Sequence, residues 1–121
     1  MTRLDHLQLP VRDWEASRDW WRDKLGFEVE FEVPERKTAA MRDSADLTVF
    51  LNGSLPVPDC TGVSFTIQVA DVDLKYAELT AQDVEFVHPP QKVYWGYGAE
   101  LLDPNGYRLS LWDERTMREK G

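Results

Sequence analysis

Cysteine is almost absent from the chain, which contains a single one, Cys60, among 121 residues. An internal disulfide is therefore excluded, and this scarcity is typical of proteins that work in a reducing cytoplasm. Nothing near Cys60 in the sequence would activate it as a nucleophile, so we interpret it as a small apolar filler rather than a catalytic thiol.

Long apolar runs are also missing. None approaches the roughly 20 residues that span a bilayer, and residues 1–12 lack the apolar core of a signal peptide. We therefore expect a cytoplasmic protein with no membrane partner. The chain is nevertheless 42% hydrophobic and 30% charged, which favours a folded protein over a disordered one. Its length suits one domain or two very small halves.

Positive charge is scarce, because 14 Lys and Arg stand against 22 Asp and Glu, for a formal net charge of −8. A nucleic-acid partner would require clustered basic residues, so this function class is excluded. The acidity permits a cationic ligand, which the field of the whole protein would attract. Taken by itself, however, the acidity is better explained by solubility alone.

A repeat organises the chain. The segment HLQLPVRD at residues 6–13 matches SFTIQVAD at residues 64–71: both alternate and both end in Val-x-Asp. Each closing Asp precedes an amphipathic stretch, where it would accept a hydrogen bond from a free N–H of the first helical turn. We predict helices over residues 14–25 and 72–82. Gly26 fits the left-handed residue that ends the first helix, and Asp83 occupies nearly the same place after the second.

Strand-rich sequence follows each predicted helix. We expect strands over residues 27–33, 38–42, 47–51, 84–87, 93–97, 99–102 and 107–112. The stretch Asp103-Pro-Asn-Gly106 is a strong turn signal. The sequence therefore predicts an α+β fold of two βαβββ modules, at residues 1–52 and 62–113, joined by a linker at 53–61. Residues 114–121 are expected to be a frayed tail.

The faces of the predicted strands differ in character. Leu, Ile, Val and Phe side chains alternate toward the helices, which leaves polar and aromatic side chains on the opposite face. A concave mixed sheet with helices on its outer face and hydroxyls and aromatics on its inner face is typical of a small-molecule site. A second apolar core or a dimer surface fits the same pattern. Trp14 and Trp21, by contrast, lie on the inward stripe of the first helix and are expected in the core.

Three motifs carry a resemblance to a known family. They are HLQLPV from His6, WWRDKLGF from Trp20, and DPNGYRLSL from Asp103. Together they resemble the vicinal oxygen chelate superfamily, which groups glyoxalase I, extradiol dioxygenases, and fosfomycin- and bleomycin-resistance proteins. The resemblance covers about residues 3–113. It implies the two-module fold and, in many members, a homodimer in which strands of two chains complete each concave sheet.

The resemblance also implies where metal ligands would stand in the metal-dependent members. His6 matches the ligand of the first strand. The other positions fall on Ser64, on Ser110 and near Thr48, whose hydroxyls do not replace a carboxylate or an imidazole on a divalent ion. We therefore expect no metal and no cofactor. A site rebuilt from His6 and Glu100 is the alternative, while His88 is expected in a loop.

The loss of the usual metal ligands is shared with the metal-free bleomycin-resistance branch, which sequesters its drug. The resemblance thus implies a cytoplasmic antibiotic-resistance or related protein that binds a planar or cationic small molecule among aromatic side chains. The expected ligand-binding residues are His6, Gln8, Thr48, Phe50, Ser64, Thr66, Trp95, Tyr97, Arg108, Ser110 and Trp112. For each aromatic, packing in the core or an interface is the competing interpretation.

Two other functions stay open. One is a lyase, isomerase or dioxygenase that uses a metal, or a cofactor-free enzyme with His6 as general base. The other is an accessory protein that contacts a macromolecule, for which no sequence feature argues.

Overall fold

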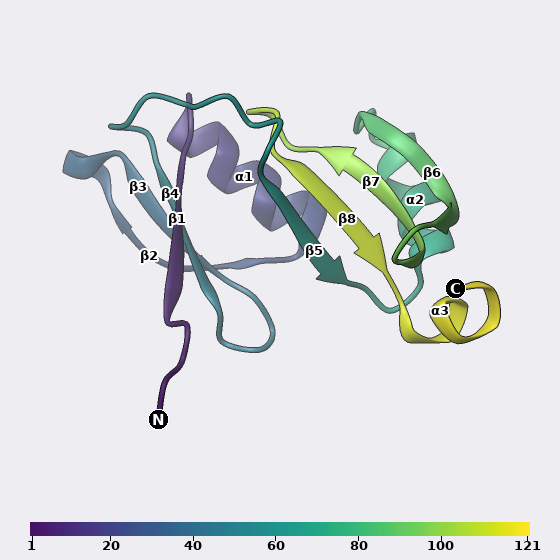
Figure 1. Ribbon diagram of the computed structural model, residues 1–121. Helices are drawn as coiled ribbons and strands as arrows, with labels where there is room; N and C mark the ends of the chain where they lie inside the picture. The colour runs from purple at the N-terminus through teal and green to yellow at the C-terminus, as the bar shows by residue number, and fades with distance from the viewer. The chain divides into compact units, whose positions relative to one another are not determined.

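The computed structural model describes residues 1–121, which divide into two compact units, Met1–Pro58 and Asp59–Gly121 (Figure 1). Each unit contains a strand, a helix and three further strands in that order, and the second unit ends in an additional helix, so the predicted α+β fold of two βαβββ modules is confirmed. We describe the two units separately.

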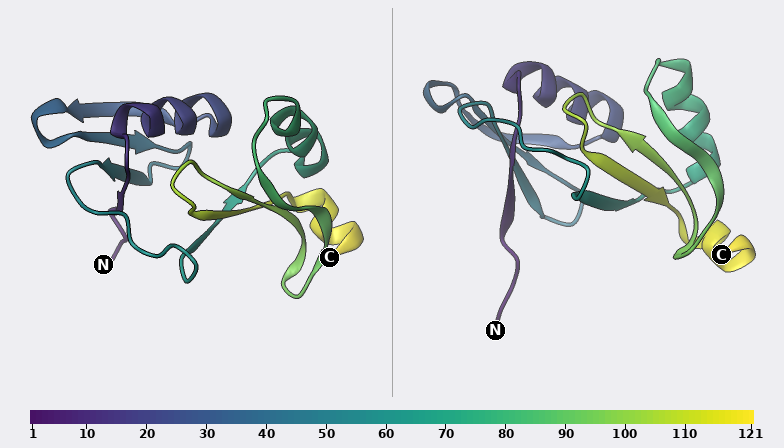
Figure 2. Two further views of the ribbon diagram at one scale, coloured as in Figure 1. Left: turned by 90° about the horizontal axis from the view of Figure 1, so that it is seen from above. Right: turned by 45° about the horizontal axis from the view of Figure 1, so that its top comes forward.

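The first unit holds a four-stranded mixed sheet in the order β1-β4-β3-β2, in which only the β1–β4 pair is parallel. Its elements are β1 (His6–Pro10), α1 (Trp14–Leu25), β2 (Glu28–Val33), a short 3₁₀ turn (Pro34–Arg36), β3 (Thr38–Arg42) and β4 (Thr48–Asn52). Helix α1 lies along one face of this sheet (Figure 2).

The second unit repeats the topology in the order β5-β8-β7-β6, again with one parallel pair, β5–β8. Its elements are β5 (Ser64–Gln68), α2 (Val72–Ala81), β6 (Phe86–Val93), β7 (Gly96–Leu102), β8 (Arg108–Trp112) and α3 (Glu114–Lys120). None of the three α-helices has the length and apolar character needed to cross a membrane.

Alternating side chains build a core between each helix and its sheet. In the first unit the buried face includes Leu9, Trp21, Met41, Val49 and Leu51. In the second unit it includes Val72, Leu79, Leu101, Leu109 and Leu111. Because successive strand residues point to opposite faces, the residues between these are directed away from α1 and α2. Trp14 is only half-buried, whereas Trp21 is fully buried as expected.

The helix caps match the repeat found in the sequence. Asp13 accepts a hydrogen bond from the N–H of Ala16 at 3.1 Å, and Asp71 accepts one from the N–H of Leu74 at 3.0 Å. Gly26 has φ +76° and Asp83 has φ +61°, so in both units the backbone leaves the helix region through a left-handed residue.

Residues 86–102 depart from the prediction. Residues 86–93 form one strand, β6, that runs through Pro89 and Pro90, and His88 lies within it rather than in a loop. β6 is an edge strand, where a proline without an N–H is tolerated, and register shifts flank His88. The expected strands 93–97 and 99–102 are replaced by the single strand β7.

The C-terminal residues were expected to fray, and this expectation is wrong. Residues 114–120 form α3, and its first turn is capped by Asp113, whose Oδ1 accepts from the N–H of Thr116 at 2.7 Å and from its hydroxyl at 2.9 Å. The short charged stretch gave no sign of this, because the helix depends on packing against β7 rather than on its own propensity.

Candidate functional site

In the first unit, the sheet face turned away from α1 brings four expected site residues together in two rows. His6 of β1 is aligned with Thr48 of β4, and Gln8 is aligned with Phe50. The imidazole of His6 stacks on the Phe50 ring, with centroids 4.5 Å apart and planes at 26°. His6 thus has one ring face covered by an aromatic group.

Phe31 of β2 joins this cluster, although the sequence analysis did not select it. Its ring meets Phe50 edge-on at 5.6 Å, and Phe31 is 44% exposed. A β-bulge between Val29 and Phe31 decides which face of the sheet Phe31 occupies. Val29 pairs with the buried Met41, whereas Phe31 pairs with Ala40. Simple alternation would have placed both on one face, so only the bulge explains the position.

Hydrogen bonds fix the polar side chains around this aromatic cluster. The Thr48 hydroxyl donates to Glu30 Oε2 at 2.8 Å. The amide of Asn52 donates to Gln8 Oε1 at 3.1 Å. The hydroxyl of Thr48 is therefore engaged by a carboxylate of its own unit.

The second unit repeats the arrangement with polar residues. Ser64 of β5 is aligned with Arg108 of β8, and Thr66 is aligned with Ser110. Gln68 is aligned with Trp112 in the next row. The structure therefore brings Ser64, Thr66, Arg108, Ser110 and Trp112 together on the face turned away from α2.

The two sets of registers define equivalent positions in the two modules. Since β1 and β4 correspond to β5 and β8, Ser110 corresponds to Phe50, and Arg108 corresponds to Thr48. The metal-ligand position expected near Thr48, in the last strand of the first module, therefore lies two residues before the counterpart of Ser110. The counterpart is an aromatic ring with no atom that could bind a metal.

Glu100 of β7 is the main residue of this face that sequence reasoning left outside the ligand-binding set. It is aligned with Ser110 on one side and with His88 on the other, and its side chain is 14% exposed. Arg108 Nε donates a hydrogen bond to Glu100 Oε1, and His88 Nε2 lies 3.7 Å from Oε2. The hydrogen bond to Glu100 raises the pKa of Arg108 above its ordinary value.

The donor set of this face does not fit a divalent ion. Ser110 and Thr66 offer neutral hydroxyls, and the one carboxylate, Glu100, is already paired with a guanidinium. Within either unit, no three His, Cys, Asp or Glu side chains gather as metal ligands. His6 and Glu100, the alternative pair, belong to different units.

The three expected aromatics of the second unit occupy different places. Trp95 lies in the turn between β6 and β7, and its ring lies over Gly98, where an added Cβ would come within 2.5 Å of it. Tyr97 is not brought together with the others. Its hydroxyl donates to Asp73 of α2 at 3.2 Å, and Lys120 of α3 lies 5.1 Å from the ring centroid, on the helix side of β7.

The surroundings of Tyr97 are those of a packed side chain. Burial raises its pKa, and the neighbouring carboxylate of Asp73 raises it further. Its phenol therefore stays protonated and serves as a donor to α2.

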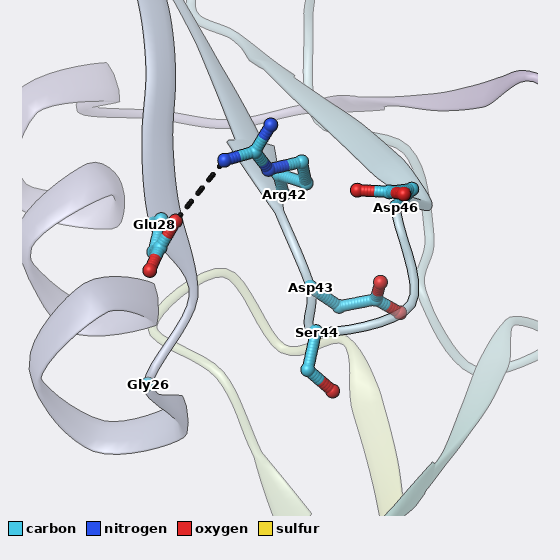
Figure 3. Close-up of a pocket in the computed structure, with 6 residues that line it drawn as sticks. All are labelled: Gly26, Glu28, Arg42, Asp43, Ser44 and Asp46. Atoms are coloured by element: carbon cyan, nitrogen blue, oxygen red, sulfur yellow. Dashed lines mark hydrogen bonds and ion pairs between the residues drawn. The ribbon is translucent and has the colours of Figure 1, made fainter.

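A separate polar pocket of about 290 Å³ opens in the first unit, where β3 leads into β4 (Figure 3). It is lined by Gly26, Glu28, Arg42, Asp43, Ser44 and Asp46. Three of its charged side chains have partners in the protein: Arg42 donates to Glu28 at 3.2 Å, and Asp43 Oδ1 accepts from the N–H groups of Ala45 and Leu47. These groups hold the turn between the two strands.

Comparison with known proteins agrees with this architecture. The family model of the Glyoxalase/Bleomycin resistance protein/Dioxygenase superfamily matches residues 3–111. No curated protein sequence matches the chain.

Solved structures share the fold over nearly the whole chain. A superfamily member from Sphaerobacter thermophilus DSM 20745 is 26% identical, with a TM-score of 0.77 over 94% of this chain and 98% of that one. TnmS3, an antibiotic binding protein from Streptomyces sp. CB03234, is 23% identical, with a TM-score of 0.79 over 93% and 96%. UcmS2 is 25% identical, with a TM-score of 0.75 over 92% and 97%. Because its βαβββ topology is repeated and the family model matches residues 3–111, the chain belongs to the Glyoxalase/Bleomycin resistance protein/Dioxygenase superfamily.

Proposed function

We propose that this protein binds a planar or cationic small molecule without a metal and sequesters it unchanged. The observation that carries the proposal is the pair of equivalent positions Phe50 and Ser110, which offer an aromatic ring and a neutral hydroxyl. The histidine that would begin a metal site, His6, is stacked on that same Phe50 ring. These groups suit stacking and hydrogen bonding better than Lewis-acid chemistry.

The ligand class follows from the side chains on the two faces. Flat rings are available at Phe31, Phe50, Trp95 and Trp112, and hydroxyls are available at Ser64, Thr66 and Ser110. The net charge of −8 would favour a cationic compound. The structural likeness to TnmS3, which is described as an antibiotic binding protein, supports a role of this kind. We further propose that the protein acts as a cytoplasmic homodimer and lowers the free concentration of a toxic compound by mass action.

Titration of tryptophan fluorescence with a broad panel of planar neutral and planar cationic compounds tests this proposal. We expect the tryptophan fluorescence to change and to reach saturation with some members of the panel. The absence of any response across the panel would contradict the proposal. Recovery of the bound compound unchanged by mass spectrometry would separate sequestration from turnover.

One observation favours a catalytic alternative. Nδ1 of His6 lies 3.1 Å from Asp5 Oδ2, and a carboxylate in that position orients an imidazole as a general base. Under this alternative the recovered compound would be altered, and His6→Ala would stop the conversion without preventing binding.

A further inference from the structure

We propose that Glu100 is the specificity-determining residue for a cationic group of the ligand, and that Arg108 is a resident cation which the ligand's cation replaces. This inference rests on the proposed function and names the ligand chemistry of the second unit. It assigns to Glu100 a recognition role beyond its place in the sheet.

Glu100 lies on an inner strand of the second sheet. It stands in the middle of the sheet, in one row with His88, Ser110 and Thr66, on the face that α2 does not cover. A carboxylate that is only 14% exposed requires a positive partner or hydrogen-bond donors to offset its lost hydration. Glu100 obtains that partner from Arg108.

Arg108 and Glu100 are unequally buried. The side chain of Arg108 is 41% exposed, about three times the exposed fraction of Glu100. The guanidinium can therefore move into water at small cost, whereas the carboxylate stays on the sheet. A ligand ammonium or guanidinium would replace one cation by another and leave the carboxylate paired.

Aromatic side chains share this face of the sheet with Glu100. The ring of Trp95 lies over Gly98, two residues before Glu100 on the same strand and on the same face. Trp112 lies two residues after Ser110 on β8, again on that face. A planar cation would thus find ring surfaces close to the carboxylate, which is the usual environment for binding an organic cation.

The test compares two matched probes at pH 7.5, the cation 9-aminoacridine and its neutral relative acridine. We expect the wild-type protein to bind the cation more tightly than the neutral compound. In Glu100→Gln, which keeps the shape but removes the charge, we expect this preference to fall by about tenfold, with acridine binding unchanged. In Arg108→Gln, which removes the competing cation, we expect tighter binding of 9-aminoacridine.

Glu32→Gln is the matched control. Glu32 also holds an arginine, Arg18, at 2.7 Å, but it does so on the edge strand β2 beside α1. The substitution removes one negative charge and one ion pair, so it reports the long-range field alone. We expect it to leave the preference for the cation unchanged.

The outcomes separate the two proposals. If wild type binds both probes but Glu100→Gln keeps the full preference for the cation, the role of Glu100 is overturned while the binding function stands. If Arg108→Gln weakens binding of the cation, the replacement of Arg108 is wrong. If wild type binds neither acridine nor 9-aminoacridine, the proposed function fails for planar aromatic compounds and this inference falls with it.

Discussion

The backbone N–H of Val72 donates a hydrogen bond to Oδ2 of Asp113 at 2.6 Å, although the two residues lie at opposite ends of the second unit's sequence. The other carboxylate oxygen of Asp113 caps α3 through Thr116. One buried side chain, 1% exposed, therefore satisfies the first turns of both α2 and α3. This link ties the last strand to the helix that covers its sheet.

Replacing Asp113 should destabilise the second unit. In Asp113→Ala the N–H groups of Val72 and Thr116 lose a charged acceptor, so we expect the free energy of unfolding to fall by about 2–3 kcal/mol. Urea denaturation followed by circular dichroism measures the loss. The exposed cap Asp13 offers a comparison, since Asp13→Ala removes one hydrogen bond and should cost about 1 kcal/mol.

The contribution of Asp113 should depend on pH in a defined direction. Burial acts to raise the pKa of its carboxyl, but the hydrogen bonds from Thr116 and Val72 outweigh burial and hold the pKa below the ordinary value of 3.8. A group with a lowered pKa in the folded state stabilises the protein above the unfolded-state pKa, and this stabilisation is lost as pH falls through the folded-state pKa. The stability difference between wild type and Asp113→Asn should therefore be largest near neutral pH and should shrink below about pH 3.8. A difference that grew on acidification would contradict this assignment.

Gly98 should not tolerate a side chain. An added Cβ would lie 2.4 Å from the carbonyl oxygen of Leu111 and 2.5 Å from the Trp95 ring. We expect Gly98→Ala to cost about 1–3 kcal/mol and to shift the tryptophan fluorescence as Trp95 is displaced. Gly62→Ala is the matched control, because nothing lies within 4 Å of its added Cβ. Unchanged tryptophan fluorescence in Gly98→Ala would show that Trp95 does not lie over β7, and stability equal to that of Gly62→Ala would contradict both close contacts.

Trp112 should contribute to ligand binding rather than to folding. It is half-buried on the face away from α2, so Trp112→Ala should weaken binding of a planar ligand by about threefold to tenfold with little change in the melting temperature. Trp112→Phe should restore most of the affinity. Trp21→Ala provides the contrast, because Trp21 is 2% exposed and its loss should cost about 3–5 kcal/mol of stability. Global unfolding of Trp112→Ala would assign Trp112 to the core instead.

We expect the purified protein to contain little bound transition metal. Protein prepared without chelators should contain divalent transition metals at well below one ion per chain, since neither sheet face offers a fitting donor set. Elemental analysis by mass spectrometry provides the measurement. Near-stoichiometric nickel, zinc, iron or manganese would favour the enzymatic alternative.

Local sequence signals were enough to predict the modules. These signals are the alternating strands, the helix caps Asp13 and Asp71, and the left-handed positions Gly26 and Asp83. Each depends only on residues nearby in the sequence, so their pattern specifies each strand–helix unit. The turn at Asp103 is of the same kind: the N–H of Gly106 donates to the Asp103 carbonyl at 3.1 Å, as its sequence predicted.

The composition of the site depended on contacts that no local pattern encodes. Strand registers decided that Phe50, and not Thr48, is the counterpart of Ser110, and a bulge decided that Phe31 faces away from α1. Pairing across β6, β7 and β8 decided that Glu100 meets Arg108 and His88. The sequence by itself therefore determined the repeated strand–helix modules, because caps, turns and alternation are short-range. Only the tertiary structure decided which side chains share a face, because hydrogen bonds between distant strands set their register.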